Sequence, residues 1–262
     1  MEERDRSSFR VDSCMQPQWS PHFQNRHTAK RGLKGDESPR RGVPSHRERP
    51  YRTMAPTKAT GSAADFVPEA SSLPALREAA AGCKGCALWQ LGTQTVFGEG
   101  PASAEIMFVG EQPGDQEDRA GRPFVGPAGQ LFDQALAAAG IDRSETYTTN
   151  AVKHFKWKAR GKRRIHQKPN WSEMTACRPW LEAELAAIGP RVLVLLGATA
   201  AQCLLGRQFR VTQNRRRLLE SDLAESVTAT IHPSAILRGE PQQRETELAA
   251  FVDDLRFVKS LL

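Results

Sequence analysis

The sequence predicts an α/β domain with three layers, a parallel β-sheet with helices on both faces, preceded by a disordered N-terminal tail. From residue 73 onward, short apolar segments alternate with longer segments of helical periodicity, which is the order that parallel sheets require. Residues 191–197 are apolar without alternation, as in a strand covered on both faces. A glycine-rich segment follows the first apolar segment, at the place where open α/β sheets build their binding sites.

The first part of the chain differs from the rest in charge and composition. Residues 1–53 carry 12 Lys/Arg against 7 Asp/Glu and have few large aliphatic residues. We predict that they are disordered and that residues 54–72, rich in Ala, Thr, Ser and Pro, form a linker. Residues 1–72 are then a basic tail and linker before a domain at 73–262. The segment from Met54 is typical of a natural protein start. Two interpretations of residues 1–53 stay open, a mis-assigned upstream extension or a basic arm that helps to hold nucleic acid.

The chain has no run of 18 or more apolar residues and no segment typical of a signal peptide. We therefore expect a cytoplasmic protein without a membrane partner. In that compartment its five cysteines indicate metal or cluster ligation, or buried thiols, before disulfides.

The predicted domain begins with a short helix, residues 73–81, that leads into Cys83-Lys84-Gly85-Cys86. A C-x-x-C pair places two thiolates near enough to share a metal ion or cluster. The pair by itself leaves zinc, iron–sulfur and redox roles open. Any further ligands must come from elsewhere in the chain.

A buried strand is predicted at residues 106–109 and a helix at 130–136. Between them, residues 109–129 read V-G-E-Q-P-G-D-Q-E-D-R-A-G-R-P-F-V-G-P-A-G, with five glycines, three prolines and four carboxylates. Strand-to-helix loops usually have about 2–6 residues. The length of this loop therefore indicates a binding site, and glycines let backbone approach a ligand closely.

A second strand is predicted at residues 145–152, because the segment is β-branched and aromatic. Asn150 lies near its end, and an amide side chain offers a donor and an acceptor together. Residues 153–168 follow with eight Lys/Arg, no acidic residue and two interleaved aromatic residues. Directly after a strand of the predicted site, this composition favours contact with a nucleic-acid backbone.

The remaining elements alternate between helix and strand. We expect helices at 171–188, 198–205 and 242–262, and strands at 191–197 and 226–231. The last strand ends in H-P-S-A-I-L-R, residues 232–238, where the proline is typical of a helix start.

Two of these segments together resemble a known family. G-E-Q-P-G-D and H-P-S-A-I-L-R resemble the two motifs of family 4 uracil-DNA glycosylases, the iron–sulfur branch of the uracil-DNA glycosylase superfamily. The resemblance covers roughly residues 73–262. Most members of the branch have Ala at the position of Gln112. That departure, Asp115 and the insertion R-G-K-R-R-I-H-Q at 160–167 resemble the UdgX type, which excises uracil and stays covalently attached to the DNA.

The resemblance implies a monomeric DNA-repair enzyme that acts on uracil-containing DNA, mainly single-stranded, at the bacterial nucleoid. Phe124 is then expected to stack on the flipped base and Asn150 to read its edge, with Gly110 and Gln112 completing the pocket. His232 is expected to donate a hydrogen bond to uracil O2. The expected DNA-backbone contacts are Lys162, Arg163, Arg164, Ser234 and Arg238.

His166 matches the histidine that attacks the sugar in the UdgX type. We expect it to form a bond to C1′ of the abasic site, so that the enzyme turns over once. Glu111 is the expected activating partner, and Asp115 or Glu111 stabilises the cationic sugar or orients the nucleophile. Which carboxylate activates His166 stays open. Two alternative functions also stay open, a multiple-turnover glycosylase that uses water and a non-catalytic protein that binds uracil-containing DNA.

The resemblance also implies a 4Fe–4S cluster held by Cys83, Cys86, His154 and Cys177. Family 4 has cysteine at the position of His154, and histidine can replace cysteine on cluster iron. Two alternatives stay open, Cys203 in place of His154 and a zinc ion in the same cage of three cysteines and one histidine.

Overall fold

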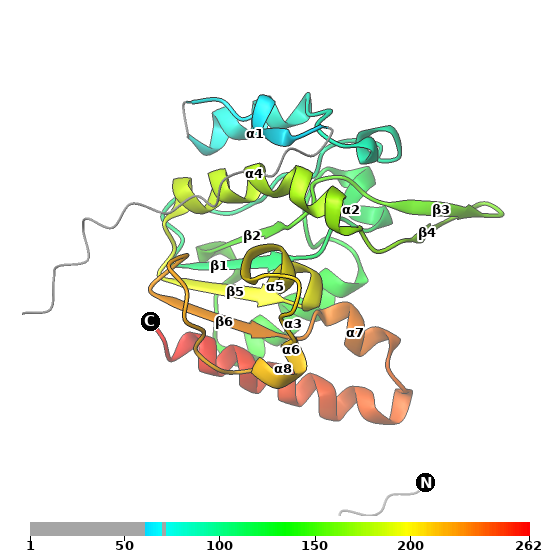
Figure 1. Cartoon of the computed structure of the whole chain (residues 1–262). Helices are drawn as coiled ribbons and strands as arrows, with labels where there is room; N and C mark the ends of the chain where they lie inside the picture. The colour runs from blue at the N-terminus through cyan, green and yellow to red at the C-terminus, as the bar shows by residue number, and fades with distance from the viewer. Residues whose placement is uncertain (1–60, 70–71) are drawn as a thin grey trace, which may run out of the picture. The chain divides into compact units, whose positions relative to one another are not determined.

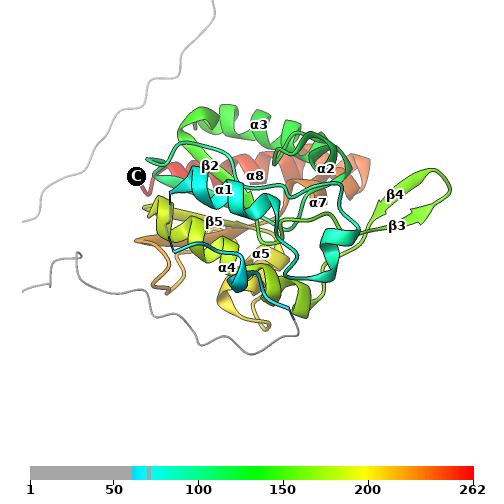
Figure 2. The same cartoon turned by 90° about the horizontal axis from the view of Figure 1, so that it is seen from above.

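The computed structural model describes residues 61–69 and 72–262, and the predictions for residues 1–60 lie outside them. Within the described residues, four parallel strands form one sheet in the order β2-β1-β5-β6 (Figure 1). The strands are β1 (Ile106–Gly110), β2 (Thr146–Asn150), β5 (Val192–Leu196) and β6 (Ser226–Thr230). Helices cover both faces of this sheet (Figure 2). The predicted three-layer α/β fold is confirmed.

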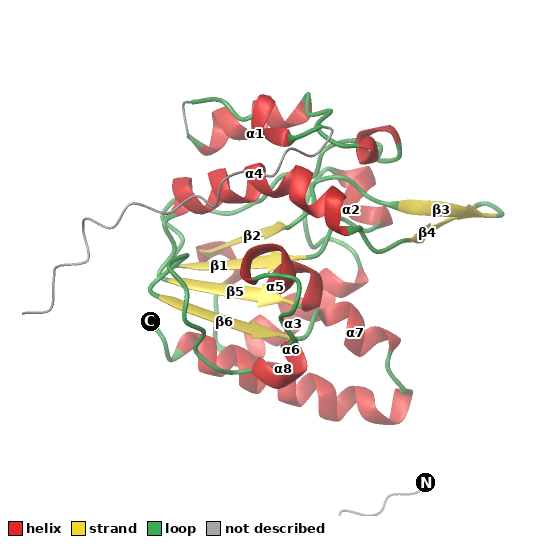
Figure 3. Ribbon diagram, in the orientation of Figure 1, coloured by secondary structure: helices red, strands yellow, loops and turns green. Residues whose placement is uncertain are grey.

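Two apolar clusters, one on each face of the sheet, hold the layers together. One contains buried side chains of α1 (Leu73–Ala81), α4 (Trp171–Ile188) and α5 (Ala198–Leu205). The other contains buried side chains of α3 (Pro127–Ala139), α7 (Pro233–Arg238) and α8 (Arg244–Lys259). Figure 3 shows where these helices lie relative to the sheet. The shorter helices are α2 (Asp115–Ala120), α6 (Val211–Asn214) and the 3-10 turns η1 (Ala63–Asp65), η2 (Ala87–Gln90), η3 (Arg143–Glu145) and η4 (Pro241–Gln243).

Strand β5 shows why its sequence is apolar throughout. Leu193 and Leu195 belong to the cluster with α4, whereas Val192, Val194 and Leu196 belong to the cluster with α8. Successive side chains of a strand point to opposite faces, and here both faces are covered. Each buried Val or Leu contributes roughly 1.5–3 kcal/mol.

Helix α4 matches its predicted bounds because both of its ends are encoded locally. The Asn170 side chain accepts from the Glu173 backbone N–H at 2.9 Å, and the Glu173 carboxylate accepts from the Asn170 backbone N–H at 2.7 Å. This reciprocal pair satisfies donors that the first helical turn leaves free. Gly189 then ends the helix with φ of 56°, which glycine adopts without steric cost.

Several short elements were not predicted from the sequence, and a helix and a hairpin near the site are the most important of them. Helix α2 lies inside the long loop after β1, and its six residues are too few to show helical periodicity. Strands β3 (Trp157–Arg160) and β4 (Arg163–His166) form an antiparallel hairpin from the basic segment. The hairpin projects from the body of the domain in both views (Figures 1 and 2).

Described residues that precede the predicted boundary at residue 73 pack against the domain. Ala63 is 1% exposed, and Phe66 and Val67 pack against the cluster that includes α4. A Cβ on Gly85 would lie 2.6 Å from the Ala63 nitrogen, so the chain around Ala63 passes directly over this glycine. The short Ala- and Ser-rich segment has no periodicity that would reveal this contact. No helix in the described part of the chain has the length and apolar character needed to cross a membrane.

Candidate active site

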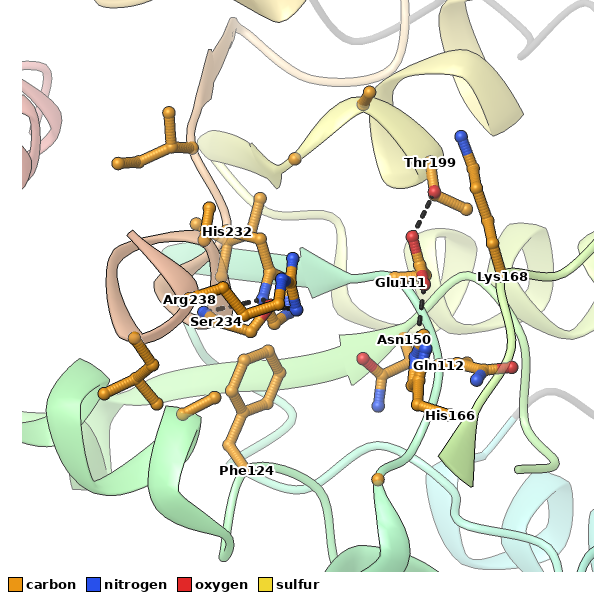
Figure 4. Close-up of a pocket in the computed structure, with 18 of the residues that line it drawn as sticks. Glu111, Gln112, Phe124, Asn150, His166, Lys168, Thr199, His232, Ser234 and Arg238 are labelled. Atoms are coloured by element: carbon orange, nitrogen blue, oxygen red, sulfur yellow. Dashed lines mark hydrogen bonds and ion pairs between the residues drawn. The ribbon is translucent and has the colours of Figure 1, made fainter. Parts of the chain in front are cut away.

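A cavity of about 690 Å³ lies at the carboxyl ends of the parallel strands. Its walls come from the loop after β1, the end of β2, the end of β4, the start of α5 and the start of α7 (Figure 4). Parallel strands end at the same edge of the sheet, so segments far apart in the sequence meet there. The predicted site residues that line the cavity are Glu111, Gln112, Asp115, Phe124, Asn150, His166, His232, Ser234 and Arg238.

Gly110, the last residue of β1, marks the point where three of these side chains converge. A Cβ at this position would overlap Asn150 Oδ1 and would lie 2.8 Å from Phe124 Cζ and 3.3 Å from His232 Nε2. The space at the centre of the three groups therefore exists only because residue 110 has no side chain. An aromatic face, an amide and an imidazole around such a space can hold a planar polar ring.

Phe124 is held in an uncommon backbone conformation. Its φ is 56°, a region that residues other than glycine seldom adopt. A Cβ on Gly129 would overlap the Phe124 carbonyl, so this glycine is what lets the loop close against α3. The Phe124 ring packs at 43° to Phe132, with 5.2 Å between ring centroids. The ring is thus fixed from behind, while its other side contributes to the cavity wall.

His232 has a defined tautomer. Its Nδ1 accepts from the backbone N–H of Ser234 at 3.1 Å, so a neutral ring carries its proton on Nε2, the atom nearest Gly110. Burial lowers the pKa of His232 to about 4, so the ring is neutral at pH 7. Arg238 donates to the Ser234 hydroxyl at 3.0 Å and supports this arrangement. His232 can therefore donate a hydrogen bond into the cavity as an uncharged imidazole.

Glu111 and His166 meet at the opposite wall. His166 Nε2 lies 3.3 Å from Glu111 Oε1, and the Thr199 hydroxyl donates to Glu111 Oε2 (Figure 4). Burial acts to raise the pKa of Glu111, but the hydrogen bonds from His166 and Thr199 outweigh burial and lower the pKa below its usual value. The pair therefore combines an ionised carboxylate with a ring whose side chain is 46% exposed. Thr199 was not predicted, because nothing in its local sequence distinguishes it from a helix-start residue.

Comparison with known proteins identifies the family. Residues 97–256 match the model of the uracil DNA glycosylase superfamily. The type-4 uracil-DNA glycosylase of Sulfurisphaera tokodaii is 37% identical over 174 residues, which cover 63% of this chain and 76% of that protein. The type-4 uracil-DNA glycosylase of Thermotoga maritima is 36% identical over 69% of this chain and 89% of that protein. The chain belongs to the type-4 uracil-DNA glycosylases. Among solved structures, Pedobacter heparinus SMUG2 matches with a TM-score of 0.45 at 11% identity, covering 60% of this chain and 77% of that chain.

In this family 4 chain, the Gln112 amide is directed to the hairpin. Its Nε2 donates to the carbonyls of Lys156 and Gln167 at 3.2 and 3.1 Å, and its Oε1 accepts from the Lys156 N–H at 3.1 Å. We predicted Gln112 as part of the uracil pocket. It does line the cavity, but its hydrogen bonds hold together the two chain segments from which the hairpin rises. The glutamine and the insertion at 160–167 are therefore physically connected.

Arg164 anchors the hairpin to α2. Its Nε pairs with Asp115, its Nη1 lies 2.6 Å from Asp118 Oδ2, and its guanidinium lies over the rings of Phe155 and Trp157 at 5.4 and 5.5 Å. We predicted a DNA-backbone contact for Arg164, whereas the structure directs it inward because two carboxylates and two aromatic faces surround it. The same ion pair neutralises Asp115, which we had placed among the catalytic groups.

The other two predicted backbone contacts of the hairpin face solvent. Lys162 and Arg163 are exposed, and within the described residues neither forms an ion pair. The hairpin register places Arg163 opposite Arg160, on the other face from Arg164. Arg163 and Lys162 are therefore available to a polyanion, whereas Arg164 is not.

A buried ion pair holds the backbone of Asn150 through a hydrogen bond. Lys153 Nζ donates to the Asn150 carbonyl at 2.7 Å and pairs with Glu184 Oε2 at 2.5 Å, and both side chains are at most 1% exposed. The Thr149 hydroxyl completes the bonds of the ammonium group at 2.7 Å. Sequence reasoning missed Glu184, which looks like any polar residue of an amphipathic helix.

Three of the predicted cluster ligands approach one another. Burial raises the pKa of the Cys177 thiol, and the thiols of Cys83 and Cys86 add to this effect, so all three are within electrostatic reach of each other. The Cys177 sulfur also accepts from the Lys153 backbone N–H at 3.2 Å. Burial raises the pKa of Cys203 to about 11 with no influence from another thiol.

The predicted fourth ligand has a different partner. His154 Nε2 lies 3.1 Å from the Thr95 hydroxyl, and burial lowers the pKa of His154 to about 4, so the ring is neutral and able to ligate. In the described part of the chain, no three Cys, His, Asp or Glu side chains are arranged to hold a single metal ion. Three cysteines and a neutral histidine are residue types that hold either a zinc ion or a cluster, and His154 would have to leave Thr95 to join the thiols.

Proposed function

We propose that this protein excises uracil from DNA, mainly single-stranded DNA, and becomes covalently linked through His166 to C1′ of the resulting abasic site. Membership of the type-4 uracil-DNA glycosylases supports the excision. The observation that carries the covalent step is the position of the His166 ring, in the cavity wall and 3.3 Å from Glu111.

The base is recognised at the space beside Gly110. Uracil turned out of the DNA enters this space, with its face on Phe124 and its edge against Asn150. The amide of Asn150 can accept from uracil N3–H and donate to O4. Phe124 and Asn150 are both buried, so neither has to lose much conformational freedom when the base binds.

Cleavage of the glycosidic bond leaves its electron pair on uracil, with negative charge at O2. His232 Nε2–H donates to that oxygen, and this hydrogen bond strengthens as charge develops. The sugar acquires oxocarbenium character at the same time. The ionised Glu111 carboxylate lies in the same cavity and stabilises that positive charge.

His166 then forms the new bond. A ring nitrogen of His166 gives its lone pair to C1′ of this cationic sugar, from which uracil has departed, and the alkylated ring becomes cationic. The ring proton passes to Glu111, which lies 3.3 Å away and is ionised beforehand. The products are a neutral imidazole joined to deoxyribose and a uracil anion that takes a proton from solvent.

The hairpin supports a UdgX-type function because it holds His166 in place. Gln112 forms hydrogen bonds with both chain segments at the base of the hairpin, and Arg164 of β4 forms an ion pair with α2. Placing a reactive group in advance contributes to rate, because the cost of orienting it is met by the fold. We assign contacts with the DNA backbone to Lys162 and Arg163 on the exposed hairpin and to Ser234 and Arg238 in the cavity wall.

We also propose a 4Fe–4S cluster at Cys83, Cys86 and Cys177, with His154 as the fourth ligand and Cys203 as the alternative. When bound, the cluster supplies a structural link between the segment before η2 and α4. Visible absorbance of the purified protein, with iron and zinc analysis, separates a cluster from a zinc ion.

The decisive experiment is a denaturing gel after mixing the protein with a uracil-containing single-stranded oligonucleotide. We expect a heat-stable band of protein joined to DNA, and we expect His166→Ser to abolish it. Lys158→Ser, on the exposed face of the same hairpin, is the matched control and should retain the band. If His166→Ser retains the band as Lys158→Ser does, the assignment of His166 is contradicted.

The same gel tests the alternative of a multiple-turnover enzyme that uses water. The ionised Glu111 carboxylate favours that alternative, because it could also polarise a water molecule. Unmodified protein with an abasic product would support it. Absence of free uracil in the reaction, measured by chromatography, would instead support a non-catalytic binding protein.

A further inference from the structure

We infer that Arg143 is a positioning residue that stabilises the departing uracil through the ring of Phe124. This inference rests on the proposed function. The guanidinium carbon of Arg143 lies 5.8 Å from the Phe124 ring centroid and 5.4 Å from that of Phe132. Phe124 lines the cavity, whereas Arg143 does not. Because Arg143 contacts the Phe124 ring from outside the cavity lining, we infer that the ring separates this cation from the space that receives the base.

The positive charge of Arg143 is only partly compensated. Its Nε lies 3.7 Å from an Asp133 carboxylate oxygen, and the Asp133 side chain is 49% exposed. The Nη1 atom is buried and has no hydrogen-bond partner among the described residues. Burial lowers the pKa of Arg143, but a guanidinium stays charged at every physiological pH. A guanidinium that packs against an aromatic ring and has one buried nitrogen without a partner calls for a reason beyond packing.

The electrostatics of an aromatic face supply that reason. The face of a phenyl ring carries partial negative charge, so a neutral base stacks on it but an anion is repelled. Uracil leaves as an anion, so the stacking residue alone would oppose the transition state. A cation on the rear face of the same ring is attracted to it and offsets this repulsion. Because the offset grows as the bond breaks, it raises the rate of cleavage more than the affinity for DNA.

The expected size follows from the distance. The base would stack roughly 3.5 Å in front of the ring, which puts it roughly 9 Å from the guanidinium. At that range, and with Asp133 opposing it, a single charge changes the rate by about tenfold.

Leaving-group dependence distinguishes this role from packing. Single-turnover excision is measured for single-stranded oligonucleotides containing uracil or 5-fluorouracil, whose fluorine already stabilises the departing anion. For Arg143→Met we expect uracil excision to slow by about tenfold and 5-fluorouracil excision by about threefold or less. Arg143→Lys keeps the cation and should retain most of the rate. Affinity for the oligonucleotide should change little in either variant.

Arg191→Met is the matched control, because it removes an exposed arginine that pairs with Glu105 at the other end of the sheet. It should slow neither substrate. Equal slowing of both substrates in Arg143→Met would overturn the inference and indicate packing alone. If Arg143→Met does not fold, Arg143→Gln is tested in its place, and the slowing of uracil excision is again compared with the slowing of 5-fluorouracil excision. A wild-type protein that releases no uracil would contradict the proposed function itself, which separates the two failures.

Discussion

Gly110 lies where Asn150, Phe124 and His232 approach one another, and it leaves the space that they enclose. A different local interaction holds each of these three residues in place. Asn150 is supported through its carbonyl by Lys153, Phe124 has a left-handed backbone that closes on Gly129, and the His232 tautomer is set by Ser234. At the residue scale, the site is therefore built largely before any ligand arrives.

The half-buried imidazole of His232 makes stability depend on pH. Its pKa is about 4 in the folded chain, against about 6.5 for a free imidazole. Between these values the unfolded chain binds a proton that the folded chain does not, so the free energy of unfolding falls as the pH falls from about 6.5 to about 4. Because His232 is only partly buried, we discount its pKa shift for solvent screening. We expect the contribution of His232 to the free energy of unfolding to fall by on the order of 1–2 kcal/mol between pH 7 and pH 5.

Urea denaturation of the wild type and of His232→Gln at pH 7 and pH 5 checks this expectation. The variant should lose less stability on acidification than the wild type, because the neutral amide does not titrate. The same loss in both proteins would show that His232 does not carry the effect.

At the scale of elements, the hairpin is the feature that distinguishes this active site. Strands β3 and β4 carry His166 to the cavity, Gln112 holds their base, and Arg164 joins them to α2. The sequence shows the cations of this segment but not the alternation that would reveal strands. Which side chains of the hairpin face the domain follows only from the strand register, which places Arg164 on the inward face and Arg163 on the outward face.

We expect Arg164→Met to release the hairpin from α2 and leave Asp118 without its cation. Adduct formation should slow by about tenfold or more, because His166 is then less well oriented, whereas the affinity for DNA should change little. Arg163→Met is the matched control on the opposite face. It should weaken DNA binding in a salt-dependent way and leave the adduct rate unchanged at saturating DNA. Equal behaviour of the two variants in single-turnover gels and binding titrations would contradict the inward and outward assignment.

At the scale of the whole molecule, one buried ion pair connects the end of strand β2 with helix α4 and the thiol of Cys177. Lys153 pairs with Glu184 of α4, supports Asn150, and donates its backbone N–H to Cys177. Glu184 also accepts from the Tyr147 hydroxyl at 2.9 Å and from the Gly98 N–H at 3.0 Å. The pocket and the proposed cluster site are thus joined through a single buried network.

Removing one partner should cost more than removing both. Lys153→Met leaves the Glu184 carboxylate buried without its cation, and we expect a loss of about 3–5 kcal/mol in the free energy of unfolding. Lys153→Met combined with Glu184→Leu should recover much of that loss, because no buried charge then remains. Urea denaturation of the two single variants and the double variant measures the coupling. Additive losses would show that the pair does not act as a unit.

By itself, the sequence determined the layered α/β fold, the bounds of α1 and α4, the strands of the sheet and the family, because these depend on apolar periodicity, helix caps and contiguous motifs. Only the tertiary structure decided which side chains meet. It set Glu111 beside His166, Gln112 under the hairpin, Arg164 against α2 and Arg143 behind Phe124. Such contacts join residues that lie far apart in the chain, and a side chain's partner depends on the register and packing of distant segments rather than on its sequence neighbours.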